Sequence, residues 1–164
     1  MHFFARFAVL FGIPYSLLNL YPVPAFLQTI AQAQSALLNA AGIAATQMGT
    51  YIQTTSQLFQ IVPSCTGLVM VFLMVALLYS TPIQNREKFA VFFSPVLFLF
   101  NQARLLAVLS VGTLYPALAE PVHAYLWFVD AALVLFLWFV AFSVDGEPMA
   151  PAEKKKGYNS KKRI

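Results

Sequence analysis

Four long apolar stretches constrain the fold of this chain more than any other feature. They cover residues 3–23, 65–81, 89–113 and 121–143. A helix needs about 20 mostly apolar residues to cross a bilayer, and each stretch comes close to that length. Hydrophobic residues make up 60% of the 164-residue chain and charged residues only 10%, which is too little polar surface for a soluble domain. The sequence therefore predicts an all-α integral membrane protein with about four transmembrane helices.

The positive charges indicate which side of the membrane each segment faces. Residues 24–64 and 114–120 contain no Lys or Arg, whereas 82–88 contains two basic residues and the C-terminal tail contains six. Loops on the cytoplasmic side carry the excess of Lys and Arg, so we expect both termini inside the cell and residues 24–64 outside. We interpret 1–143 as one membrane-embedded domain. The tail, 144–164, is predicted to be a disordered basic segment that contacts anionic lipid rather than nucleic acid.

The N-terminal stretch has a second interpretation as a signal peptide, since Val23 and Ala25 make a weak cleavage pattern. We expect an uncleaved anchor. Either interpretation leaves a multi-pass protein of the cell membrane.

The outer segment is predicted to contain structure of its own. Between residues 24 and 42 the apolar positions recur at helical spacing and polar residues fill the other face. The apolar set is Phe26, Leu27, Ile30, Ala33, Leu37, Leu38 and Ala41, and the polar set is Gln28, Gln32, Ser35 and Asn39. This pattern predicts an amphipathic helix that lies on the membrane surface or on the other helices. Residues 45–62 are rich in Thr, Tyr, Ile and Val around Gly49, which favours a small β-hairpin leading into Cys65.

The cysteine and histidine content excludes several kinds of site. Cys65 is the only cysteine, so an internal disulfide, a CxxC redox pair and a cysteine-rich metal site are ruled out. The two histidines, His2 and His123, are far apart and no HExxH motif is present. No glycine-rich phosphate loop is found either. We therefore expect neither a metal ion nor a cofactor.

Three chemically capable side chains are predicted to meet at the outer face. Cys65 begins the second apolar stretch and His123 begins the fourth. Arg104 lies in the outer half of the third, about 13 Å below Thr113 at 1.5 Å per residue. These three side chains come from three different spans, and the hydropathy of the spans does not by itself require them to lie on the same side of the membrane.

Each of these residues also has an interpretation in which it plays no part in catalysis. A lone cysteine in an apolar protein is often an inert small hydrophobe, and a histidine at a helix start is often an interfacial residue. A charge inside a span is costly, so Arg104 is expected to be functional or paired. Asp130 lies about 13 Å into the fourth span, so a structural ion pair with Arg104 is the alternative, and it is compatible with catalysis. Asn101 lies one turn before Arg104 and is expected to hydrogen-bond into the same pocket or to a neighbouring helix.

The three groups together suit acyl transfer through a thioester. A thiolate is the nucleophilic form of cysteine, and a nearby cation or a helix N-terminus favours it. His123 is able to take the thiol proton and return a proton to the leaving amine. Arg104 cannot act as a base, but its guanidinium can stabilise a thiolate, an oxyanion or a substrate carboxylate.

At these residues the sequence resembles the exosortase/archaeosortase family. The family has a cysteine in a C-S/T-G-L/I motif at a helix start, then an N-x-x-R motif, then a polar residue, often His. The corresponding segments are Cys65-Thr66-Gly67-Leu68, Asn101-Gln102-Ala103-Arg104 and His123. Residues 115–138 resemble the short bacterial subgroup called exosortase H.

The resemblance implies a membrane cysteine protease or transpeptidase. Its substrates would be exported proteins that end in a short motif, a hydrophobic helix and a basic cluster, and the new C-terminus would pass to an acceptor such as a lipid. Cys65 would be the nucleophile, Arg104 the essential basic residue and His123 the third member, with Gly67, Asn101 and Asp130 in support. One alternative is a non-enzymatic assembly subunit in which the arginine only pairs. Another is a transporter, which the short spans and the absence of an internal repeat disfavour.

Overall fold

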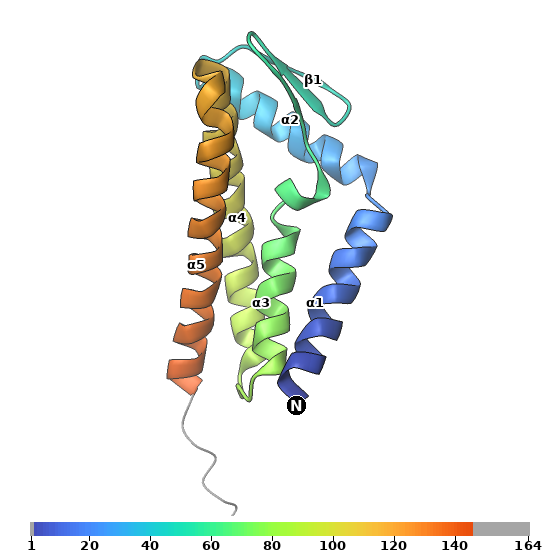
Figure 1. The fold of residues 1–164 in the computed structure, drawn as a ribbon, viewed down its shortest axis with the longest axis vertical. Helices are drawn as coiled ribbons and strands as arrows, with labels where there is room; N and C mark the ends of the chain where they lie inside the picture. Colours follow the sequence, from blue (N-terminus) through green and yellow to red (C-terminus); the bar gives the residue numbers. More distant parts are fainter. Residues whose placement is uncertain (1, 146–164) are drawn as a thin grey trace, which may run out of the picture.

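The computed structural model describes residues 2–145 of the chain, as a helical bundle with a small sheet at one end (Figure 1). The elements in chain order are α1 (His2–Leu20), α2 (Pro24–Ala40), β1 (Ala45–Met48), β2 (Tyr51–Thr54), β3 (Leu58–Gln60), η1 (Pro63–Cys65), α3 (Leu68–Ser80), α4 (Arg86–Leu114), η2 (Pro116–Leu118) and α5 (Ala119–Asp145). The predicted helical membrane fold is confirmed. The predicted basic tail over 144–164 falls almost entirely outside the described residues.

Three of the four predicted spans are long and apolar enough to cross a bilayer. They are Phe3–Leu20, Arg86–Leu114 and Pro116–Asp145. The remaining helix, α3, has 13 residues, which gives a length of about 20 Å against a hydrocarbon core of about 30 Å. The prediction that this helix begins at Cys65 was wrong, because the chain first makes the short 3-10 turn η1 and a left-handed turn at Gly67 (φ +85°).

The short helix α3 lies at the centre of the bundle and contacts α1, α4 and α5. Figure 1 shows α1 and α5 on either side of it. Its buried side chains Met74 and Leu78 pack with Leu97 of α4 and Val134 of α5. The remaining wall is α1, on which the rings of four residues spaced four apart stack on one another: Phe3, Phe7, Phe11 and Tyr15. These contacts build an apolar body that is long enough to sit in a bilayer.

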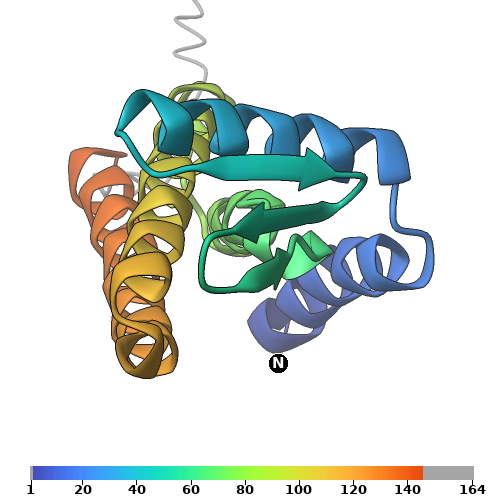
Figure 2. The same ribbon diagram turned by 90° about the horizontal axis from the view of Figure 1, so that it is seen from above.

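One end of the bundle is covered by α2 and the sheet (Figure 2). The sheet has three antiparallel strands in the order β1-β2-β3, so the predicted hairpin gains a third strand. Met48 pairs with Tyr51 across a turn in which Gly49 has φ +63°, a backbone conformation that favours glycine. The first turn of α1 and the last turn of α5 lie at the opposite end (Figure 1).

The helix α2 forms where the helical spacing of apolar residues predicted it, but the face that is buried against the protein is a different one. Its buried residues are Leu27, Ile30, Ala31, Gln34, Ser35 and Leu38. The face packed on the protein thus differs from the predicted apolar face at four positions: Ala33, Leu37 and Ala41 are exposed, and Ser35 is only 6% exposed. One contact accompanies this rotation: the Gln34 Nε2 finds hydrogen-bond partners on α4, which offsets part of the cost of its burial, while its Oε1 has no partner among the described residues.

Candidate active site

Cys65 lies in the middle of a tight turn that connects the sheet to α3. We call residues 63–67 the Cys65 turn. Pro63 starts it with a fixed φ, and its carbonyl accepts hydrogen bonds from the Thr66 N–H at 3.2 Å and from the Thr66 hydroxyl at 2.7 Å. Gly67 then takes φ +85° and lets α3 begin at Leu68. Cys65 consequently lies just before the first turn of α3, half-buried, and its thiol is free.

Gly67 lies directly against α4. A Cβ atom at this position would come within 3.0 Å of the Asn101 Cβ and 3.1 Å of the Asn101 Nδ2. A larger residue would therefore meet both a steric clash and an unfavourable backbone conformation. The glycine brings the Cys65 turn and α4 close enough for side-chain amides to reach the backbone of the turn.

Asn101 connects the Cys65 turn to Arg104. Its Nδ2 donates to the Cys65 carbonyl at 2.8 Å, and its Oδ1 accepts from the Arg104 Nη1 at 3.3 Å. The side chain is almost completely buried, at 1% exposed. Of the two alternatives foreseen for Asn101, the hydrogen bond into the pocket is the one present, since both of its partners line the pocket.

Arg104 forms an ion pair with Asp130 of α5 through its Nη1 and the Asp130 Oδ2. The two side chains are 8% and 0% exposed, so the equal depths expected along the two helices are found in space. Among the described residues, neither the Arg104 Nε nor the Asp130 Oδ1 has a hydrogen-bond partner. One edge of the guanidinium is thus used by the protein, while its Nε is left for another acceptor.

Cys65, Arg104 and His123 line one pocket of about 480 Å³. Its lining comprises Phe11, Tyr15, Ser64, Cys65, Val69, Met70, Arg104, His123 and Trp127. The volume lies within the range of about 300–1,000 Å³ that is common for ligand sites. Within residues 2–145 no hydrogen bond joins the thiol to His123 or Arg104, and His123 itself is exposed. The three groups therefore share a cavity without hydrogen-bonding to one another.

The walls of this pocket are aromatic and come from helices on opposite sides of α3. Phe11 and Tyr15 belong to α1, and Trp127 belongs to α5. Tyr15 is 41% and Trp127 is 55% exposed, so these walls are accessible from outside the bundle. The pocket therefore combines aromatic walls with a thiol, a guanidinium and an imidazole.

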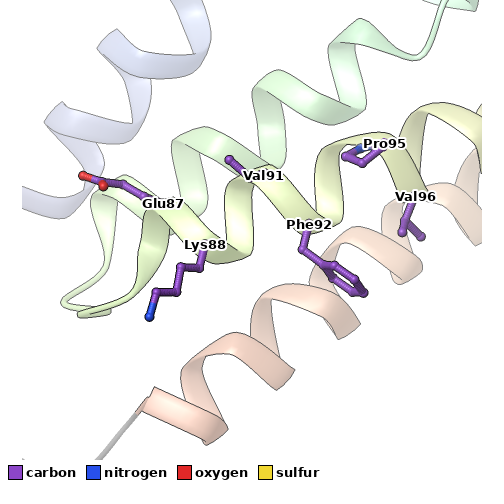
Figure 3. A pocket seen from close by; sticks show the side chains of 6 residues that line it. All are labelled: Glu87, Lys88, Val91, Phe92, Pro95 and Val96. Atoms are coloured by element: carbon purple, nitrogen blue, oxygen red, sulfur yellow. The ribbon is translucent and has the colours of Figure 1, made fainter.

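A second hollow, of about 560 Å³, lies on α4 alone and differs in character (Figure 3). Its lining is Glu87, Lys88, Val91, Phe92, Pro95 and Val96. Val91 and Phe92 are 77% and 68% exposed, which fits contact with lipid chains. Its lining contains neither a cysteine nor a histidine, so this hollow does not supply the groups expected for acyl transfer through a thioester.

Two amide side chains near the site were not foreseen as site residues. Gln102 occupies the second position of the N-x-x-R segment and hydrogen-bonds to the Cys65 turn, and Gln34 of α2 hydrogen-bonds to Gln102. The only sequence signal for them is that amide side chains stand beside apolar ones. Within the described part of the chain, no group of three or more His, Cys, Asp or Glu residues is arranged to hold a metal ion.

Comparison with known proteins gives one match. The model of the family described as transmembrane exosortase matches residues 1–144. Searches of curated proteins and of solved structures gave no match.

Proposed function

The chain belongs to the transmembrane exosortase family, and from this premise we propose that it is a cysteine transpeptidase of the cell membrane. It cleaves a C-terminal sorting signal from exported proteins at the outer face and passes the new C-terminus to an acceptor. The observation that carries this proposal is the single pocket in which Cys65, Arg104 and His123 meet from three different elements. With the pocket at the outer face of the membrane, both termini are cytoplasmic, and the sheet and α2 are outside.

Cys65 is the nucleophile in this mechanism. His123 takes the thiol proton as the sulfur attacks the scissile carbonyl, and a tetrahedral oxyanion forms. Collapse of this intermediate breaks the C–N bond, and His123 returns the proton to the leaving amine. The acceptor nucleophile then attacks the thioester and gives its proton to His123; the C–S bond breaks, and His123 returns the proton to the departing Cys65 thiolate. The exposed position of His123 supports this role, because its ring is able to reorient toward a bound peptide.

Arg104 stabilises the oxyanion or a carboxylate of the sorting motif. Its Nη1 is already occupied by Asp130 and Asn101, which fixes the plane of the guanidinium. The Nε has no protein partner among the described residues although it is buried. A buried donor of this kind supports the binding of an anionic or oxyanionic group, since leaving it unpaired is costly.

The hydrophobic helix of the sorting signal approaches between α1 and α5. The exposed aromatic residues Tyr15 and Trp127 on these helices support this route, because they border the pocket that contains Cys65. With the basic end of the signal in the cytoplasm, the cleavage motif lies near the outer leaflet at the level of the thiol.

The decisive variant is Cys65→Ala. We expect it to abolish processing while the protein accumulates in the membrane at the wild-type level, because no other residue in the pocket can form a thioester. Mass spectrometry of C-termini in cells with the wild type and the variant would identify the processed substrates and measure the loss. Processing that persists in Cys65→Ala would exclude covalent catalysis by this residue.

A second candidate function is that of a non-enzymatic membrane subunit. The buried ion pair between Arg104 and Asp130 favours it, because such a pair can serve packing alone. Under this alternative Cys65 is inert. A small thiol reagent distinguishes the two: rapid alkylation of Cys65 in the native protein, blocked by a bound signal peptide, supports the transpeptidase, whereas a peptide that gives no protection supports the subunit.

A further inference from the structure

Two consecutive amide side chains of α4 hold two consecutive carbonyls of the Cys65 turn. The Asn101 Nδ2 donates to the Cys65 carbonyl at 2.8 Å, and the Gln102 Nε2 donates to the Thr66 carbonyl at 2.9 Å. Successive residues of an α-helix point about 100° apart, so the two amides approach the turn from different directions. Two hydrogen bonds from different directions restrict both the position and the tilt of the peptide that carries the thiol.

Gln34 of α2 determines the orientation of the Gln102 amide. The Gln34 Nε2 donates to the Gln102 Oε1 at 3.1 Å and to the Gln102 backbone carbonyl at 3.2 Å. Because the oxygen of the Gln102 amide accepts from Gln34, its NH2 group must face the other way, toward Thr66. Gln34 is 1% exposed, so its own amide is shielded from bulk water.

We propose that Gln102 and Gln34 are positioning residues for Cys65. The proposal rests on the proposed function, in which Cys65 is the nucleophile. Gln102 fixes the turn directly, and Gln34 acts through Gln102 from the outer helix α2. Correct placement of a nucleophile matters strongly, since a shift of about 1 Å can cost about 100-fold in rate.

The first test compares turnover of a purified substrate by three variants. Gln102→Met keeps the length of the side chain but removes the donor, and we expect kcat to fall about 10- to 100-fold with KM unchanged. Gln34→Met leaves Gln102 in place but free to rotate, and we expect a smaller fall, on the order of fivefold. Gln32→Met is the matched control on the exposed side of α2 and is expected to behave as the wild type.

A double variant separates positioning from mere packing of α2 on α4. If Gln34 acts only through Gln102, the variant Gln34→Met/Gln102→Met turns over no more slowly than Gln102→Met alone. Two independent structural roles would instead multiply the losses. Multiplied losses would overturn the assignment of Gln34.

A second readout needs no substrate. Cys65 is the only cysteine, so the rate of its alkylation by iodoacetamide reports the freedom of the turn. We expect Gln102→Met to raise this rate several-fold, Gln34→Met to raise it less and Gln32→Met to leave it unchanged. Rates in Gln102→Met within about twofold of the wild type, for both alkylation and kcat, would overturn the positioning role. Processing that persists in Cys65→Ala would overturn the proposed function instead, and the alkylation comparison would still decide whether Gln102 and Gln34 hold the turn.

Discussion

The two halves of α4 face different surroundings although they belong to one continuous helix. In the half nearer its N-terminus, Phe93 and Leu97 are buried among apolar side chains of α3 and α5, such as Met74 and Val134. In the other half, Asn101 and Gln102 hydrogen-bond to the Cys65 turn, and Arg104 pairs with Asp130 of α5. We refer to these as the apolar half and the polar half of α4.

The difference indicates that the two halves have different structural roles, one in packing the bundle and one in fixing the geometry of the pocket. Apolar contacts have no preferred direction, so the apolar half builds the body of the bundle and tolerates changes that conserve volume. Hydrogen bonds are directional, and polar groups in a membrane interior are costly when unpaired. The polar half therefore fixes the geometry of the Cys65 pocket. Each prediction below tests whether these two halves behave as differently as their contacts indicate.

The largest expected effect is an all-or-none difference in cysteine labelling, which tests on which side of the membrane each end of α4 lies. Single cysteines are introduced in a Cys65→Ala background at Thr55, in the exposed loop after β2, and at Gln84, in the exposed loop before α4. We expect an impermeant maleimide to label position 55 in intact cells and position 84 only after permeabilisation. Both sites are exposed, so the reagent reaches either one from its own side of the membrane. Labelling of position 84 in intact cells would invert the topology and remove the polar half from the outer side.

Arg104→Lys is expected to be nearly as inactive as Arg104→Ala, with both proteins at normal levels. Lysine keeps the charge and is able to satisfy Asp130, but it lacks the planar fork that leaves an Nε for a second acceptor. Loss of one oxyanion donor costs about 100- to 1,000-fold in rate. The ratio of processed to unprocessed substrate measures the effect. A largely active lysine variant would reduce Arg104 to a member of a structural ion pair.

Asp130→Asn is expected to be milder than either arginine variant. The amide oxygen can still accept from the Arg104 Nη1, but the charge that balances the buried guanidinium is lost. Breaking a buried pair costs about 3–5 kcal/mol when one partner is removed outright, so we expect a lower unfolding temperature and partial activity. The same processing assay, combined with thermal unfolding in detergent, separates the two effects. If Asp130→Asn were inactive and Arg104→Lys active, the ion pair itself would be the essential feature.

Part of this site could be predicted from the sequence because membrane helices have a fixed rise. A rise of 1.5 Å per residue places Arg104 and Asp130 at the same depth, and the two side chains do form an ion pair. The same reasoning puts Cys65 and His123 at the same end of the bundle, and both line the pocket with Arg104. The all-helical class followed from the apolar stretches, because each is close to the length that a helix needs to cross a bilayer.

The remaining features depend on tertiary contacts that spacing does not encode. Gln34 is buried because α2 crosses α4 at one particular rotation, and the amphipathic pattern alone favoured a neighbouring face. The start of α3 depends on the left-handed backbone of Gly67 and its close approach to Asn101. Neither is visible in a hydropathy pattern, because hydropathy carries no information on how a helix is rotated against its neighbour or on the backbone conformation of one residue.

The smallest expected effect is that of Leu97→Met, which tests where the apolar half ends. Leu97 is 1% exposed and lies one turn before Asn101 on the same face of α4. Methionine conserves the volume and adapts its shape, so we expect a loss of less than about 1.5 kcal/mol in stability and unchanged processing. Asn101→Leu is the matched change one turn away; it removes the hydrogen bonds to Cys65 and Arg104 and is expected to lower turnover at similar protein levels. If Leu97→Met reduced turnover as strongly as Asn101→Leu, packing throughout α4 would control the thiol, and the division between its two halves would be wrong.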